Sequence, residues 1–216
     1  MVNKKMKETY IFDFDGTLVD SMTPAVKTLL GYLDERGVKY PDDIVKTIIP
    51  LGYRGITDYY VENFGLKETP QEVYATLVER LEGVYTNEVM PKPEVEKTLI
   101  ALKKRGASLS ILTASPHEFL DPCVKRLGWE KYFDNLWSSE DFNMKKSEPF
   151  IFIEAAKRLG KKPSECCMVD DNIKALQSSK EAGLKTIAVY DSYSAEYEEE
   201  IRSFVDKYAV VFNEIL

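Results

Sequence analysis

Three short apolar segments, each ending in polar side chains, constrain the fold of this chain more than any other feature. The first runs through Phe12 into two aspartates, the second covers residues 109–112 and ends in hydroxyl groups, and the third covers residues 166–169 and ends in two more aspartates. After residue 92 such segments alternate with helical patterns, which predicts an α/β fold with a parallel sheet between helices. Ligands of an open α/β sheet collect outside the carboxyl ends of its strands, so we expect these polar ends to meet at one edge.

Residues 17–91 interrupt this alternation with helical patterns alone. Thr23-Pro24 is expected to begin one helix that Gly37 can end, and Thr69 with Glu72 forms a capping box before another. Residues 58–64 are expected to complete a third helix between these two. The sequence therefore predicts a core domain of residues 1–16 and 92–216, with a helical domain of residues 17–91 inserted after the first strand.

The two aspartates of the first segment are the first candidates for chemistry. In an extended strand, side chains two residues apart point the same way, so Asp13 and Asp15 would face one site while Phe12 and Phe14 face the interior. Gly16 then allows the backbone to turn sharply. Two carboxylates at close quarters repel each other unless a cation or a shared proton compensates. The spacing indicates either a divalent metal or an acid/base division of labour, and an acidic turn without chemistry is the alternative.

Four separated motifs together resemble the haloacid dehalogenase-like (HAD) hydrolase superfamily over nearly the whole chain. They are the run Asp-Phe-Asp-Gly-Thr-Leu-Val-Asp-Ser at residues 13–21, Thr113, Lys146, and the pair Asp170-Asp171. The lysine is often preceded by Gly and followed by Pro in the family, whereas Lys145 and Ser147 flank it here, so Lys145 is the alternative. The resemblance implies a three-layer αβα Rossmann-like core, and it implies that the helical insert is a C1 cap with hinges near residues 17–21 and 88–93.

The resemblance also implies a role for each motif residue. Asp13 would be the nucleophile and Asp15 the general acid/base, and Mg²⁺ would be held by the Asp13 carboxylate, the Asp15 backbone carbonyl and Asp171, with Asp170 acting through water. The chemistry of a phosphate monoester agrees with these roles, because Mg²⁺ and Lys146 would neutralise phosphoryl oxygens while Thr113 donates a hydrogen bond. Attack by Asp13 would give an aspartyl-phosphate, which water then hydrolyses. Members of the superfamily that displace halide lack an acid at position 15, so Asp15 favours phosphoryl transfer.

We therefore expect a Mg²⁺-dependent phosphatase that acts on a small phosphorylated metabolite and resembles the phosphoglycolate phosphatase and β-phosphoglucomutase branch. A phosphomutase is the alternative, but no residue clearly marks the base that it would need for the incoming hydroxyl. A phosphate-binding protein without turnover is a third possibility, which the intact set of motif residues disfavours.

Substrate contacts are harder to predict. Arg54 is the candidate residue of a substrate-reading loop, because Gly52 and Gly55 would make the segment around it flexible and its guanidinium could pair with an acidic group of the substrate. A surface arginine without substrate contact is the alternative. Ala114 and Ser115 are candidates because they follow Thr113 directly. His117, the only histidine, is expected to lie at the surface where a helix begins, with substrate contact as the alternative.

Composition excludes several partner classes. The net charge of −7 and the pI of about 5.0 argue against nucleic acid or an anionic membrane as a partner. Three cysteines do not form an even disulfide framework, so we expect reduced, structural thiols. Residues 1–8 lead into no apolar stretch of signal-peptide length, and no segment approaches a membrane span. We expect a cytoplasmic monomer or homodimer.

Overall fold

The computed structural model describes residues 8–216, and these divide into two compact units. One unit runs through Asp20 and resumes from Met90 to Leu216, and the other is Ser21–Val89. The basic residues 1–7, which entered the prediction that no signal segment is present, lie outside the described residues. No helix in the described part is long and apolar enough to cross a membrane.

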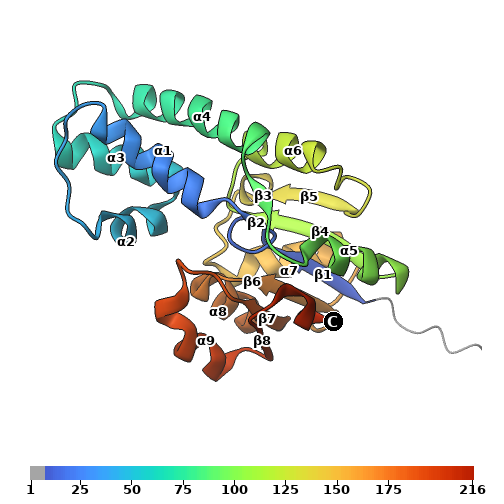
Figure 1. The fold of residues 1–216 in the computed structure, drawn as a ribbon. Helices are drawn as coiled ribbons and strands as arrows, with labels where there is room; N and C mark the ends of the chain where they lie inside the picture. The colour runs from blue at the N-terminus through green and yellow to red at the C-terminus, as the bar shows by residue number, and fades with distance from the viewer. Residues whose placement is uncertain (1–7) are drawn as a thin grey trace, which may run out of the picture. The chain divides into compact units, whose positions relative to one another are not determined.

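A six-stranded parallel sheet forms the centre of the first unit (Figure 1). In spatial order it contains β5 (Asn135–Ser138), β4 (Ser108–Thr113), β1 (Thr9–Phe12), β6 (Cys166–Asp170), β7 (Lys185–Val189) and β8 (Lys207–Ala209). The predicted α/β fold with a parallel sheet is confirmed. The first strand lies between β4 and β6, so the three segments that end in polar residues are immediate neighbours.

Alternate residues of β1 face opposite sides of the sheet, and both sides are covered. Ile11 lies in a buried cluster with Ile151 and Phe152 of the helix α7. Phe12, its neighbour, packs against the rings of Phe133 and Phe212. The helices of this unit are α5 (Val95–Lys104), α6 (His117–Arg126), α7 (Pro149–Arg158), α8 (Ile173–Glu181) and α9 (Glu198–Phe204). A strand buried on both faces explains why the segments read as continuous apolar runs rather than as alternating patterns.

Short 3₁₀ helices and one small ladder complete this unit. The 3₁₀ helices are η2 (Ser139–Phe142), η3 (Pro163–Glu165), η4 (Ala195–Tyr197) and η5 (Phe212–Ile215). The strands β2 (Val19–Asp20) and β3 (Met90–Pro91) pair antiparallel. Just after β3, the Lys92 backbone N–H donates to the Leu18 carbonyl at 3.0 Å. The two chain segments that border the insert are therefore joined by backbone hydrogen bonds.

The second unit is helical, as the sequence predicts. It contains α1 (Met22–Asp34), α2 (Ile44–Ile48), η1 (Ile49–Leu51), α3 (Gly52–Phe64) and α4 (Pro70–Asn87). The capping box at the start of α4 is confirmed, because the Thr69 hydroxyl accepts from the Glu72 backbone N–H while the Glu72 carboxylate accepts from that of Thr69. Stacked rings of Tyr32 and Tyr60 lie in its core.

The prediction that residues 53–55 of this unit form a loop is wrong. Residues 53–55 lie in the first turns of α3, which begins at Gly52 rather than near residue 58. Gly52 adopts a φ of +67°, so it changes the chain direction at the start of the helix instead of loosening a loop. The Arg54 guanidinium lies 4.5 Å from the centre of the Tyr74 ring, where a cation is attracted to the aromatic face.

Candidate active site

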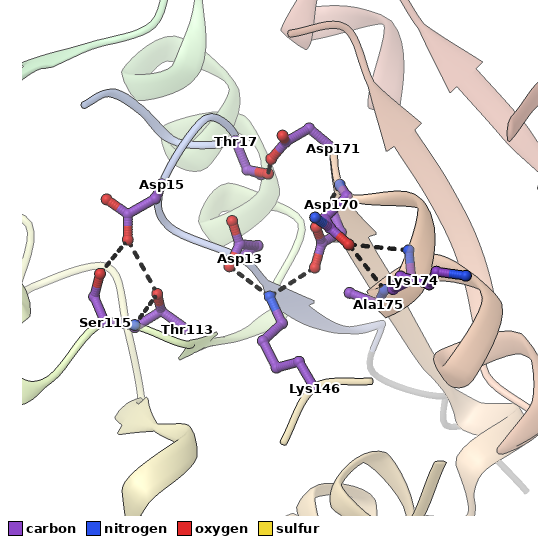
Figure 2. Close-up of polar contacts among 11 residues, drawn as sticks. Asp13, Asp15, Thr17, Thr113, Ser115, Lys146, Asp170, Asp171, Lys174 and Ala175 are labelled. Atoms are coloured by element: carbon purple, nitrogen blue, oxygen red, sulfur yellow. Dashed lines mark hydrogen bonds and ion pairs between the residues drawn. The ribbon is translucent and has the colours of Figure 1, made fainter. Parts of the chain in front are cut away.

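Lys146 and two aspartates form a buried ionic cluster at the carboxyl ends of β1 and β6 (Figure 2). The Lys146 ammonium donates to Asp13 Oδ1 at 2.5 Å and to Asp170 Oδ2 at 2.7 Å. Asp13 follows the last residue of β1, and its backbone N–H still donates to the Val169 carbonyl of β6 at 2.9 Å. That bond extends the ladder by one residue and thereby aims the Asp13 side chain at the cluster. Lys145 is exposed, so the structure brings Lys146, and not Lys145, against the aspartates.

Asp171 adds a third carboxylate to the cluster. Its Oδ1 accepts a hydrogen bond of 2.8 Å from the Thr17 hydroxyl, which comes from the loop after β1. Gly16 lies directly beside it with a φ of +76°, and a Cβ at this glycine would approach Asp171 Oδ2 to 2.9 Å. Only glycine therefore fits this close approach without strain or displacement.

Three aspartates are placed so that they could share a metal ion. Asp13, Asp170 and Asp171 each offer a carboxylate oxygen, and these oxygens lie within 4.8 Å of one another. Carboxylate oxygens are ligands that Mg²⁺ and similar hard cations prefer. Three carboxylates face a single ammonium, so a divalent cation fits both the donor set and the charge of the site.

Burial and this excess of negative charge shift the ionisation of the cluster. Burial raises the pKa of Asp13 to about 7, although the Lys146 ammonium acts in the opposite direction. Burial, with the charges of Asp170, Asp13 and Asp191, raises the pKa of Asp171 well above its usual value. Burial disfavours charged Lys146, but the two aspartates outweigh this effect and raise the pKa of its ammonium. Such shifts in a buried carboxylate cluster are typical of functional sites.

Asp15 lies in the same loop as Asp13 but has different partners. Its Oδ2 accepts from the Ser115 hydroxyl at 2.6 Å and from the Thr113 hydroxyl at 3.2 Å (Figure 2). Both hydroxyls lie at the carboxyl end of β4, the other neighbour of β1. The structure therefore brings all the predicted motif side chains to one edge of the sheet, with Asp13 beside Lys146 and Asp15 beside the hydroxyl groups.

Other predicted residues lie outside this arrangement. Ala114 is exposed between the two hydroxyl residues. His117 begins α6, as expected, and its ring nitrogens lie 2.9 Å from Asp121 Oδ1 and 2.9 Å from Asp141 Oδ2. Arg54 belongs to the second unit.

Sequence reasoning missed two contacts of the site and one residue close to it. Ser115 was expected to contact substrate, yet its hydroxyl is nearer to Asp15 than that of Thr113 is. The bond between Thr17 and Asp171 joins residues 154 positions apart, which no local pattern reveals. Asp191 also went unnoticed, although it follows β7 closely, as the other aspartates follow their strands.

Comparison with known proteins agrees with this fold. The family model of the haloacid dehalogenase-like hydrolases matches residues 10–189. The phosphoglycolate phosphatase of Aquifex aeolicus is 30% identical over 178 residues, which cover 82% of this chain and 81% of the relative. The phosphorylated carbohydrates phosphatase of Thermotoga maritima is 23% identical over 180 residues, 83% of each chain. The crystal structure of CbbY from Rhodobacter sphaeroides in complex with phosphate has a TM-score of 0.84 at 19% identity, covering 97% of this chain and 96% of that one.

The chain, which has a parallel α/β sheet and a buried aspartate–lysine cluster at its carboxyl edge, belongs to the haloacid dehalogenase-like hydrolase family. It is a phosphatase enzyme of that family, in the branch that includes phosphoglycolate phosphatases. The resemblance inferred from the four sequence motifs is thereby confirmed.

Proposed function

We propose that this phosphatase hydrolyses the phosphate monoester of a small metabolite in a Mg²⁺-dependent reaction that passes through an aspartyl-phosphate on Asp13. The observation that carries the proposal is the buried contact of Asp13 with Lys146, beside two further aspartates. A carboxylate can attack an anionic phosphoryl group only where positive charge compensates the repulsion. This cluster offers one fixed cation and a donor set for a second.

Asp13, Asp171 and the backbone carbonyl of Asp15 are the proposed metal ligands, with Asp170 nearby. When bound, Mg²⁺ would neutralise charge on the transferring phosphoryl group. Lys146 would neutralise another phosphoryl oxygen and hold the Asp13 side chain in place. The Thr113 hydroxyl donates to Asp15 in the structure. Once substrate is present, it would rotate and donate to a phosphoryl oxygen instead.

The first chemical step forms one bond and breaks another at phosphorus. An Asp13 carboxylate oxygen attacks, the bond from phosphorus to the ester oxygen breaks, and Asp15 gives its proton to the leaving alkoxide. The products of this step are the free alcohol and an aspartyl-phosphate. The hydrogen bond from Ser115 orients the Asp15 carboxyl group for this transfer.

The second step returns the enzyme to its starting form. Asp15, now a carboxylate, takes a proton from water while the water oxygen attacks phosphorus, and the bond between phosphorus and the Asp13 oxygen breaks. Inorganic phosphate leaves, Asp13 is again a carboxylate, and Asp15 is again protonated. A single carboxyl group therefore serves as acid and then as base.

We propose that the helical insert, predicted as residues 17–91, is the cap domain and supplies residues that select the leaving group. Arg54 stays the candidate partner of an acidic group on the leaving moiety, although it lies in a helix. An Arg54→Met variant would then change KM for some phosphate esters of a panel and not for others, whereas a surface arginine would leave the pattern unchanged. The cytoplasmic location and the monomeric or homodimeric state stay predictions.

The test is phosphate release from a panel of phosphorylated metabolites with Mg²⁺ and with a chelator. The panel includes phosphoglycolate and sugar phosphates, because relatives are named for phosphatase activity on these classes. We expect Mg²⁺-dependent release from at least one small ester without any bisphosphate activator. Isomerisation of a sugar phosphate that depends on such an activator would instead show the phosphomutase, and binding of phosphate esters without turnover would contradict both.

A further inference from the structure

Lys92 is a second cation held close to the active site, and no motif of the sequence predicts it. Its side chain is 17% exposed, and its ammonium makes three hydrogen bonds. It donates to the Gly16 carbonyl at 2.6 Å, to the Tyr190 carbonyl at 2.6 Å and to Asp191 Oδ2 at 2.9 Å. An ordinary surface lysine keeps its ammonium in water and its side chain mobile, so three hydrogen bonds to one ammonium are not expected there.

Asp191 is held as firmly as its partner. Its side chain is only 7% exposed, and its Oδ1 accepts a hydrogen bond of 2.9 Å from the Tyr193 backbone N–H. It follows β7, the neighbour of β6, which ends in Asp170 and is followed directly by Asp171. A buried carboxylate needs such partners, because an uncompensated charge in this environment is strongly destabilising.

The contacts of Lys92 end on the loop that carries the site. Its ammonium binds the carbonyl of Gly16, the residue between Asp15 and Thr17, and its backbone N–H binds the Leu18 carbonyl at 3.0 Å. Thr17 in turn donates to Asp171 (Figure 2). One residue thus fixes two carbonyls of the loop, on both sides of the hydroxyl that orients Asp171.

We propose that Lys92 and Asp191 are a positioning pair that fixes the loop of residues 15–18 and thereby sets the metal-binding and reacting geometry at Asp13, Asp15 and Asp171. This inference rests on the proposed function for its catalytic consequence. Its structural part concerns the affinity of the site for Mg²⁺ and stands apart from turnover. Neither residue touches the reacting atoms; both act through the loop.

Positioning and simple charge effects predict different signs, which makes the proposal testable. If only long-range charge mattered, removal of the Lys92 cation would tighten Mg²⁺ binding and removal of the Asp191 anion would weaken it. If the pair positions the loop, Lys92→Met releases the Gly16 carbonyl and Asp191→Asn weakens the hold on the ammonium that binds this carbonyl, so both weaken Mg²⁺ binding. Residues that support metal ligands in this way typically contribute about 10–100-fold in affinity or activity.

The experiment measures the Mg²⁺ dissociation constant by calorimetry without substrate, together with kcat and KM, for Lys92→Met, Asp191→Asn and the double variant. Lys97→Met is the matched control, because Lys97 is highly exposed and its side chain pairs with the surface residue Glu94. Thermal unfolding of each protein ensures that binding is measured well below the melting temperature. Asp191→Asn keeps an oxygen acceptor for Lys92, so it is expected to fold even where Lys92→Met does not.

We expect both single variants to weaken Mg²⁺ binding by about tenfold and to lower kcat by about as much, with KM changed by less than about twofold. The double variant should be no worse than the poorer single variant, because the two residues act as a unit. Tighter Mg²⁺ binding in Lys92→Met, or additive losses in the double variant, would overturn the proposal. Absence of phosphatase turnover in the unmodified protein would overturn the proposed function. The Mg²⁺ dissociation constants of the variants would then still test whether Lys92 and Asp191 position the metal site.

Discussion

Two clusters of charged side chains, one in each unit, follow opposite rules. In the sheet unit, Lys146 is buried with Asp13 and Asp170, and carboxylates outnumber cations. In the helical insert, Arg80 forms a two-pronged pair with Glu35 at 2.8 and 2.7 Å, with both side chains at least a third exposed and the charges balanced. The first arrangement has a large desolvation energy opposing it, whereas the second remains hydrated and has little.

The difference teaches where function lies in this molecule. A chain selected for stability alone would not bury three carboxylates beside one ammonium, because desolvation and repulsion both oppose it. The exposed pair of the insert loses little hydration and gains little. We therefore expect substitutions in the two clusters to differ in kind: those of the sheet unit should remove activity, and those of the insert should change stability slightly.

The largest effect is expected for Asp13→Asn. The amide keeps the volume of the side chain but is a far poorer nucleophile, so kcat should fall by about 10⁴-fold or more. Stability should be unchanged or higher, because one of several repelling buried carboxylates is gone. Phosphate release and thermal unfolding measure the two effects, with Asp42→Asn on the exposed surface as the control. Retained turnover would remove Asp13 from its role.

Lys146→Met breaks the buried cluster itself. Asp13 and Asp170 would lose the ammonium that they share, and loss of one partner of a buried pair is expected to destabilise the protein by about 3–5 kcal/mol. Activity should fall as well, since no fixed cation would face the phosphoryl group. Chemical unfolding with and without Mg²⁺ measures the loss, and Mg²⁺ should restore part of it. A loss no larger than that of an exposed lysine would refute the contrast between the clusters.

Two glycines extend the comparison to the backbone. At Gly16, an added Cβ meets Asp171 at 2.9 Å and the φ of +76° disfavours alanine, so Gly16→Ala should cost about 1–3 kcal/mol and weaken Mg²⁺ dependence. Gly83 lies within α4 with open space around it, so Gly83→Ala should stabilise the protein by about 1 kcal/mol. Opposite signs in unfolding experiments are expected, and equal signs would contradict the account of the Gly16 contact.

Arg80→Met tests the exposed cluster of the insert. We expect a loss of about 0.5–1 kcal/mol that decreases at high salt, because solvent and ions screen an exposed pair. Turnover should stay within about twofold of the unmodified enzyme. Urea unfolding at low and high ionic strength measures the effect, and a salt-independent loss as large as that of Lys146→Met would erase the difference between the units.

The smallest change in stability is expected at His117, whose pairs with two aspartates are exposed although they belong to the sheet unit. Burial lowers the pKa of His117, but the hydrogen bonds with Asp121 on α6 and Asp141 on η2 outweigh it and raise the pKa. A raised pKa in the folded state means that the stabilisation is complete below the unfolded value of about 6.5 and is lost as the pH rises through the folded value. His117→Gln should therefore lower stability by about 0.5 kcal/mol at low pH and by less at high pH. A difference between the two proteins that grows with pH would contradict this sign.

The sheet and its active edge were predictable because their signals are local. Continuous apolar runs ending in carboxylates or hydroxyls mark β1, β4 and β6, and the capping box at Thr69 marks the start of α4. The short strand β8 was not predicted, and only Ala209 of its three residues is buried. The start of α3 was misplaced because Gly52 and Gly55 were taken as signs of a loop.

Contacts between distant parts of the chain set the limit of sequence reasoning at the site. Neighbouring lysines at 145 and 146 have the same chemistry, and only the path of the chain into α7 decides which one is buried. The partners of Lys92 lie 76 and 99 positions away, so no spacing rule reveals them. Residue types therefore predicted the chemistry, whereas the packing of the loop after β1 had to be observed.

The stereochemical course at phosphorus tests the covalent route most directly. A substrate whose phosphoryl group is made chiral with oxygen isotopes is hydrolysed, and the configuration of the product phosphate is determined. Two successive displacements, by Asp13 and then by water, predict net retention of configuration. Inversion would mean that water attacks the substrate directly, and it would contradict a reaction through an aspartyl-phosphate.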